Sequence, residues 1–184
     1  GMTKGMTATT FAPGKSATRA QAAAMLVRIY EKLQTAGKGE SHGFYAISSY
    51  SQIQLAEGMD SVSFGWSRMT WADGTAKLAT TSAGGNEFCV PSGYETAVKA
   101  LEQSGTQRNL MVYMDTSAGL NELLSSEAGR TQAVSEIVNE VTVSYRALGR
   151  NPYTGVTIDF EGLRSAQKAS FTAFLTALQK ELKT

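Results

Sequence analysis

The stretch "YTGVTIDFEGL", residues 153–163, joins a short run of strand-forming residues to two carboxylates. Side chains alternate between the two faces of a strand, so Asp159 and Glu161 point the same way, with Cα atoms roughly 6–7 Å apart. Like charges this close in a partly buried strand favour a raised pKa for at least one carboxyl, which opposes folding and suits proton transfer. The stretch therefore predicts a strand that ends in a candidate acid-base site.

The composition is that of a globular domain. The chain has 184 residues, of which 42% are hydrophobic and 18% charged, and its formal net charge is +1. Because the charges are interspersed, with no basic stripe, we expect no nucleic-acid partner and no binding to a membrane surface. The single cysteine, Cys89, excludes an internal disulfide and a cysteine-based metal cage.

The start of the chain, "GMTKGMTATTF", lacks the apolar core of a signal peptide. No apolar run approaches the ~20 residues that span a bilayer. The sequence by itself therefore fits either a cytosolic protein or a piece of a longer one.

Strand and helix patterns alternate along most of the chain. Strand-like runs occupy residues 43–48, 61–66, 109–115 and 155–160. Helical spacing of apolar residues follows at 92–105 and 130–149, and again from Ser165, a plausible N-cap, onward. The three predicted apolar stripes are Tyr94, Val98 and Leu101; Val134, Ile137, Val138, Val141, Tyr145 and Leu148; and Phe171, Phe174, Leu175, Leu178 and Leu182.

This alternation predicts an α/β fold with a parallel sheet. In such folds ligands bind at the carboxyl ends of the strands. Glu161 lies just past one of these ends, which makes the acidic pair a candidate site.

The chain divides into three parts by composition. Residues 1–34 contain a Pro-Gly turn and a helix that Ser16 or Thr18 can cap. Its apolar positions are Ala22, Met25, Leu26, Ile29 and Leu33. Residues 35–42 are Gly-rich and polar, which predicts a linker containing His42, the only histidine; residues 43–184 form the second unit.

An Asp-x-Glu pair at a strand end is by itself ambiguous, because such pairs also bind Mg²⁺, cap helices or hydrate an edge. Here "GVTIDFEGL" followed by "FTAFLTALQKEL" resembles the fourth strand and helix of chitinase-like family-18 glycoside hydrolases. Their pattern is Asp-Gly-x-Asp-x-Asp-x-Glu. Gly155, Asp159 and Glu161 match it, whereas Thr154 and Thr157 replace its first two aspartates. "GVxIDFE" looks like the bacterial spore and cell-wall subgroup.

The resemblance implies that residues 43–184 are the N-terminal half of a TIM (β/α)8 barrel, without cofactor or metal. It implies hydrolysis of N-acetylglucosamine-containing polysaccharide. Glu161 would protonate the glycosidic oxygen while the substrate's own acetamido group attacks the anomeric carbon. Asp159 would orient and stabilise that group, and the Thr157 hydroxyl would take over the support that the pattern's aspartate gives.

Other residues near strand ends are candidates for the sugar site: Tyr45, Trp66, Tyr113 and Asp115. Aromatic rings offer flat apolar faces to pyranose rings. The alternative for each aromatic is ordinary core packing.

The first segment resembles the second half of an S-layer homology repeat, whose Thr-Arg-Ala-Glu signature reads here Thr18, Arg19, Ala20 and Gln21. Such repeats bind anionic secondary cell-wall polysaccharides, with the arginine pairing an acidic sugar substituent. With half a repeat, we expect no strong binding through Arg19. The resemblance implies an extracellular location at a bacterial cell wall.

Two other functions stay open. A complete eight-stranded barrel needs about 250 residues, so residues 43–184 can instead be a non-catalytic carbohydrate-binding or anchoring module. A phosphate or metal enzyme on a doubly wound sheet would need a Gly-rich phosphate loop or a histidine cluster, which the sequence lacks. Half a barrel would leave two strand edges unpaired, which predicts self-association.

Overall fold

A computed structural model describes residues 14, 16–35, 39–145 and 147–183. The chain divides into two compact units, Gly1–Glu40 and Ser41–Thr184. Of the predicted first segment and linker, residues 1–13, 15 and 36–38 lie outside the described residues. Each unit is considered by itself.

The first unit contains the predicted helix, α1 (Arg19–Thr35). Thr18, one of the two predicted caps, accepts a hydrogen bond from the Gln21 amide at 3.2 Å, and the Gln21 side chain accepts one from the Thr18 amide at 2.9 Å. This reciprocal capping box holds the start of the helix. Leu26, on the predicted apolar stripe, is exposed, and the Leu33 side chain lies outside the described part.

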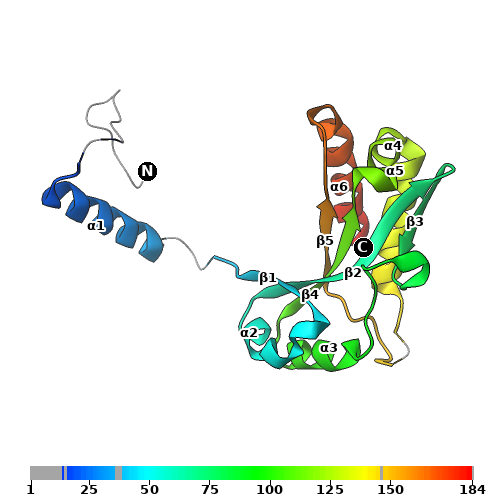
Figure 1. Cartoon of the computed structure of the whole chain (residues 1–184), viewed down its shortest axis with the longest axis horizontal. Coiled ribbons are helices and arrows are strands. Elements are labelled where there is room, and N and C mark those ends of the chain that lie inside the picture. Colours follow the sequence, from blue (N-terminus) through cyan, green and yellow to red (C-terminus); the bar gives the residue numbers. More distant parts are fainter. Residues whose placement is uncertain (1–13, 15, 36–38, 146, 184) are drawn as a thin grey trace. The chain divides into compact units, whose positions relative to one another are not determined.

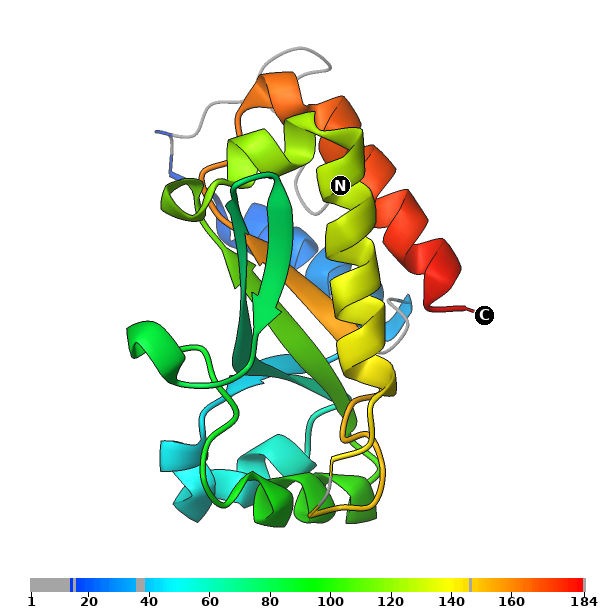
Figure 2. The ribbon, with the colours of Figure 1, turned by 90° about the vertical axis from the view of Figure 1, so that its right-hand side faces the viewer.

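The second unit is an α/β fold with a parallel sheet (Figures 1 and 2). Its strands are β1 (His42–Tyr45), β2 (Ser61–Ala72), β3 (Thr75–Ala79), β4 (Gln107–Met114) and β5 (Gly155–Phe160). Strands β1, β2, β4 and β5 are parallel and lie in chain order, while β3 pairs antiparallel with the end of β2. The predicted fold class is confirmed at this level.

Helices connect the strands. They are α2 (Ile53–Glu57), α3 (Tyr94–Gln103), α4 (Leu120–Ser125), α5 (Glu127–Thr142) and α6 (Lys168–Glu181), with 3-10 turns at Ile47–Gln52, Ala83–Gly85, Thr116–Ala118 and Ser165–Gln167. Figure 2 shows α5 and α6 side by side over the sheet. No helix among the residues described here is long and apolar enough to cross a membrane.

The strand boundaries differ from the predicted ones. His42 belongs to β1 rather than to a linker, and β1 ends at Tyr45, where the chain enters a 3-10 turn. Strand β2 continues to Ala72 and forms a hairpin with β3 that was not predicted. The hairpin turn is Asp73-Gly74, with φ of 51° and 73°, and two positive φ values match the twist of paired strands.

The helix expected at 130–149 starts at Glu127 and ends at Thr142. Val143 is extended because its carbonyl and that of Glu140 accept hydrogen bonds from the Asn151 side chain, which fixes a loop there. Tyr145 and Leu148, predicted on the helical stripe, lie beyond the helix but still pack on the core. Helix α4 was not predicted.

The last helix begins as a 3-10 turn at Ser165 and becomes α-helical at Lys168. Ser165 is not its cap. The Arg164 amide instead donates to Oε1 of Gln167 at 3.1 Å. Phe174 and Leu178 of the predicted stripe are buried, whereas Leu175 and Leu182 are partly exposed, at 38% and 39%.

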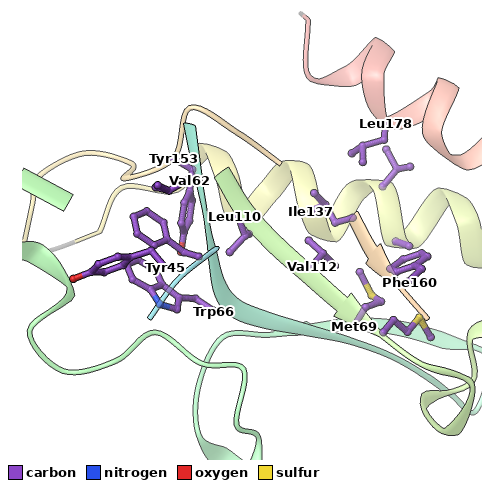
Figure 3. Packing of buried hydrophobic residues seen from close by; sticks show 14 of the residues in the cluster. Tyr45, Val62, Trp66, Met69, Leu110, Val112, Ile137, Tyr153, Phe160 and Leu178 are labelled. Carbon is purple, nitrogen blue, oxygen red and sulfur yellow. The ribbon is translucent and has the colours of Figure 1, made fainter. Parts of the chain in front are cut away.

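One face of the sheet, here called the core face, packs against the helices (Figure 3). Leu110, Val112 and Met114 of β4 are fully buried there, and Phe160 of β5 stacks on Phe174 of α6 with ring centroids 5.4 Å apart. Because strand side chains alternate, the intervening residues lie on the opposite face, here called the site face.

Candidate functional site

The acidic pair lies at the carboxyl end of β5. Asp159 is paired with Tyr113 of β4, and the Glu161 amide donates to the Met114 carbonyl at 2.9 Å, so β4 fixes the backbone as far as Glu161. Since Phe160 points to the core face, Asp159 points to the site face. Asp159 is half-buried and Glu161 is exposed.

The chain turns immediately after Glu161. Gly162 has a φ of +79°, and a Cβ added there would lie 2.9 Å from Cγ2 of Thr116, in the loop that follows β4. Both the conformation and the close approach favour glycine. The two loops that follow neighbouring strands therefore pack together beside the acidic pair.

Tyr113 is the aromatic residue that the structure brings to this site. Its ring stacks on Phe88, with centroids 4.1 Å apart and planes 11° from parallel, and Cζ of Arg68 lies 5.4 Å from its centroid. Its hydroxyl donates to Oδ2 of Asp115 at 3.0 Å. Phe88 comes from the loop after β3, so three separate segments meet at Tyr113.

Charge around the Tyr113 hydroxyl raises its pKa above the usual value. The hydrogen bond to Asp115 contributes most, followed by burial and by the negative charges of Asp115 and Glu161, while Arg68 opposes the shift. The Glu161 charge thus acts on the same hydroxyl as Asp115, which connects the ends of β4 and β5 electrostatically. At neutral pH the hydroxyl is a donor.

Asp115 is held by the protein itself. Its carboxylate accepts hydrogen bonds from Ser117 Oγ at 2.6 Å and the Ala118 amide at 3.0 Å, and Arg68 lies 3.4 Å away. The Ser117 hydrogen bond is the main cause of a lowered pKa for Asp115, and Tyr113, Ala118 and Arg68 add to it. Asp115 is therefore an ionised cap of the following turn that also orients Tyr113.

Thr157 lies on the site face two residues before Asp159. Its hydroxyl is 2.6 Å from Ser63 Oγ, and Ser63 Oγ is 3.0 Å from Nε2 of His42. Thr157, predicted to support Asp159, is thus joined by hydrogen bonds to Ser63 and His42, which were not predicted for the site.

Tyr45 and Trp66 lie on the core face instead. Trp66 stacks on Phe64 at 4.0 Å and is 3% exposed, and Tyr45 packs edge-on against Phe64. Core packing, the alternative considered for both aromatics, accounts for their positions. Figure 3 shows them together with Tyr153, away from Phe160 at the end of β5.

Several functional candidates had only weak sequence signals. Ser63 and Arg68 face the site because of the register between β2 and β4, which shifts at an irregularity between Phe64 and Ser67. No simple alternation places residues on both sides of such a shift. Phe88 is in an irregular loop, for which periodicity gives no signal.

Two of the hollows in the described part of the chain lie apart from the acidic pair. One, of about 480 Å³, runs between α5 and α6 over Val134, Val138, Ala173 and Ala177. The other, of about 970 Å³, has Tyr94, Glu140 and Tyr145 among its lining residues. Within the described ranges, no three His, Cys, Asp or Glu side chains form a group that could hold a metal ion.

The arrangement suits acid-base chemistry next to a flat aromatic surface. The exposed Glu161 carboxyl, the half-buried Asp159 carboxyl two residues before it and the Tyr113 phenol donor lie at the same end of a parallel sheet. No family model matches the sequence, and no curated protein matches it.

Proposed function

We propose that residues 43–184 are the N-terminal half of a (β/α)8 barrel of the family-18 glycoside hydrolase type. The protein that carries them hydrolyses N-acetylglucosamine-containing glycans, peptidoglycan or chitin-like, at a bacterial cell surface. The observation that supports this most is the position of Asp159 and Glu161 at the carboxyl end of β5, next to Tyr113 on β4. The chain order of the four parallel strands is the order of neighbouring strands in such a barrel.

In this proposal Glu161 is the general acid. It donates its proton to the glycosidic oxygen as the C–O bond breaks, and the acetamido oxygen of the substrate forms the new bond to the anomeric carbon. Asp159, two residues earlier and within β5, orients the acetamido group and balances the positive charge that develops on it. The stacked rings of Tyr113 and Phe88, beside this strand end, form the aromatic part of the proposed sugar site.

The test replaces Glu161 by glutamine in the protein that carries this chain. We expect hydrolysis of N-acetylglucosamine oligomers to fall by ~10²–10⁴-fold, the usual contribution of a general acid, with binding largely retained. Glu57→Gln is the matched control, because Glu57 ends α2 just before β2, at the opposite end of the sheet. A Glu161→Gln variant that keeps most of the rate would remove Glu161 from this role.

A second candidate is a non-catalytic carbohydrate-binding or anchoring module. The half-buried Tyr113–Phe88 stack and the fully engaged Asp115 carboxylate favour binding without requiring catalysis. In that case the wild-type protein binds the oligomers and does not cleave them, and Glu161→Gln changes neither property.

For the first unit we propose a remnant of a cell-wall-binding repeat. Arg19 is exposed at the first residue of α1, and the Thr18–Gln21 capping box shows that Gln21 serves the helix start as a glutamate would. A secondary cell-wall polysaccharide is its proposed ligand, with weak binding.

A further inference from the structure

The site face carries a chain of hydrogen bonds that joins three strands. His42 of β1 has both ring nitrogens engaged: Nδ1 lies 2.7 Å from Ser61 Oγ, and Nε2 lies 3.0 Å from Ser63 Oγ. Ser63 of β2 in turn lies 2.6 Å from Thr157 Oγ1 of β5. This row of hydrogen bonds thus crosses β4 and ends at Thr157, two residues before Asp159.

The middle of this chain is sealed from water. Ser63 is fully buried, so the hydrogen-bond partners of its hydroxyl must be protein atoms. Asn109 of β4 lies beside Gly155 of β5, where an added Cβ would meet Asn109 Oδ1 at 2.6 Å. Gly155 therefore makes room for Asn109 on the same face that the chain of hydroxyls crosses.

A hydroxyl has a single proton, so a row of hydroxyls has a direction. If Nε2 of His42 donates to Ser63, then Ser63 donates to Thr157, and the Thr157 proton is free to be donated onward. If the direction is reversed, Thr157 gives its proton to Ser63 and can only accept. A doubly protonated imidazole donates from both nitrogens and allows only the first direction.

We propose that His42 and Ser63 are positioning residues that aim the Thr157 hydroxyl as a donor toward Asp159. This inference rests on the proposed function, in which Thr157 takes the place of a carboxyl group that supports Asp159. Asp159 is the carboxylate that shares both strand and face with Thr157. A donor aimed at it stabilises its ionised form and fixes its orientation.

The other groups around His42 do not connect it to Thr157 and Asp159. Phe44 meets the imidazole edge-on, with ring centroids 5.5 Å apart. Ser61 holds the second nitrogen. The acidic group in the turn before β2, Asp60, accepts two hydrogen bonds from Ser41, at 2.7 and 2.8 Å.

His42 is the only histidine of the chain, so its ring nitrogens give an unambiguous nuclear magnetic resonance signal. We would record the ¹⁵N imidazole resonances, which report which ring nitrogen carries the proton, in the wild type and in Thr157→Val, Asp159→Asn and the double variant. Asp159→Asn should lower the share of the imidazole that is protonated at Nε2, because it removes the charged acceptor that favours donation from His42 through Ser63 to Thr157. In the Thr157→Val background this effect should vanish.

Thr154→Val is the matched control. Thr154 precedes β5, and its hydroxyl bonds the Arg108 backbone rather than Ser63, so the imidazole signals should not change. Thr157→Ser keeps the hydroxyl and should restore the wild-type response. Equal effects of Asp159→Asn with and without the Thr157 hydroxyl would overturn the inference.

A second measurement separates this inference from the proposed function. If the protein hydrolyses N-acetylglucosamine oligomers, Ser63→Ala and Thr157→Val should lower kcat and alter its pH profile, and Thr157→Ser should recover both. Unchanged kcat and pH profile in an active protein would refute the positioning role. If the imidazole signals depend on Asp159 through the Thr157 hydroxyl but the wild type does not hydrolyse the oligomers, the positioning role is supported and the proposed enzyme is refuted.

Discussion

Tyr45 is a buried tyrosine whose hydroxyl has no hydrogen-bond partner among the residues described. Burying a hydroxyl without a partner costs about 1–3 kcal/mol. Tyr45→Phe should therefore leave the free energy of unfolding unchanged or raise it by about 1 kcal/mol. The urea midpoint at unchanged slope measures this.

Tyr153 is the matched control, since it is equally buried but its hydroxyl lies 3.0 Å from that of Tyr145. Tyr153→Phe should lower the free energy of unfolding by about 1 kcal/mol. A destabilised Tyr45→Phe variant would show that the Tyr45 hydroxyl has a partner after all.

Tyr145 and Tyr153 also predict how stability depends on pH. Burial, the main cause, raises the pKa of both phenols above the usual value of 10.0, and the charges of neighbouring groups, Glu140 among them, add to the shift. The unfolded chain loses these protons first, so the stabilisation is complete below about pH 10 and is lost as the pH rises further.

Urea midpoints measured at pH values on both sides of about 10 test this. Tyr145→Phe should reduce the alkaline loss of stability, and Tyr50→Phe, at an exposed tyrosine, is the control. An alkaline slope that is the same in wild type and Tyr145→Phe would contradict the assignment.

At the scale of elements, helix α5 completes the outer edge of β3. The Ala76 amide donates to Oε1 of Gln132 at 2.9 Å, and the Leu78 amide donates to Oε2 of Glu136 at 3.0 Å. Two side chains of one helix thus supply the hydrogen-bond acceptors that a neighbouring strand would give to this edge.

Glu136→Ala should leave the Leu78 amide without its acceptor and lower the free energy of unfolding by about 1–3 kcal/mol. Amide hydrogen exchange at Leu78 should accelerate, while Ala76, held by Gln132, should change less. Glu136→Gln keeps an acceptor oxygen and should retain most of the protection. Equal exchange at Leu78 in all three proteins would show that α5 does not protect this edge.

The elements that could be predicted were those in which one physical signal dominates. The apolar spacing of α3 and the alternation of β5 were sufficient, and the same alternation places Thr157 on the face of Asp159. The end of α5 could not be read in this way. Tyr145 continues the helical spacing, but it reaches the core through a loop, where it packs on Tyr94 and Tyr153.

The β3 hairpin had a local sequence signal, whereas the positions of several site residues had none. The Asp73-Gly74 dipeptide between two strand-like runs is a known hairpin signal and would have predicted β3. The positions of His42, Ser63 and Phe88 at the site follow from strand register and loop path. These are set by contacts between distant segments, which no local pattern records.

For the Ser41–Thr184 unit as a whole, self-association stays our prediction. Within the described residues, β1 and β5 each pair on one side only, and Phe44 on the site face is 69% exposed. Open edges beside exposed apolar surface favour pairing with a second copy. Light scattering at micromolar concentration should therefore give a mass above the 19.6 kDa of one chain.

Phe44→Lys should shift the population toward the single-chain mass, because it places a charge where two copies would meet. Leu55→Lys is the control, since Leu55 is as exposed but belongs to α2. A wild type that scatters as a single chain and binds no hydrophobic dye would refute the prediction.

The chain order of the parallel strands has a consequence for protein synthesis. As the chain leaves the ribosome, each parallel strand can pair with the one made before it, so the sheet grows at one edge. Asp159 joins the sheet when β5 pairs with β4, after β1, β2 and β4 have been made. Until then Tyr113 and Asp115 border an open strand edge, and the nascent chain is exposed to aggregation there before Asp159 and Glu161 arrive.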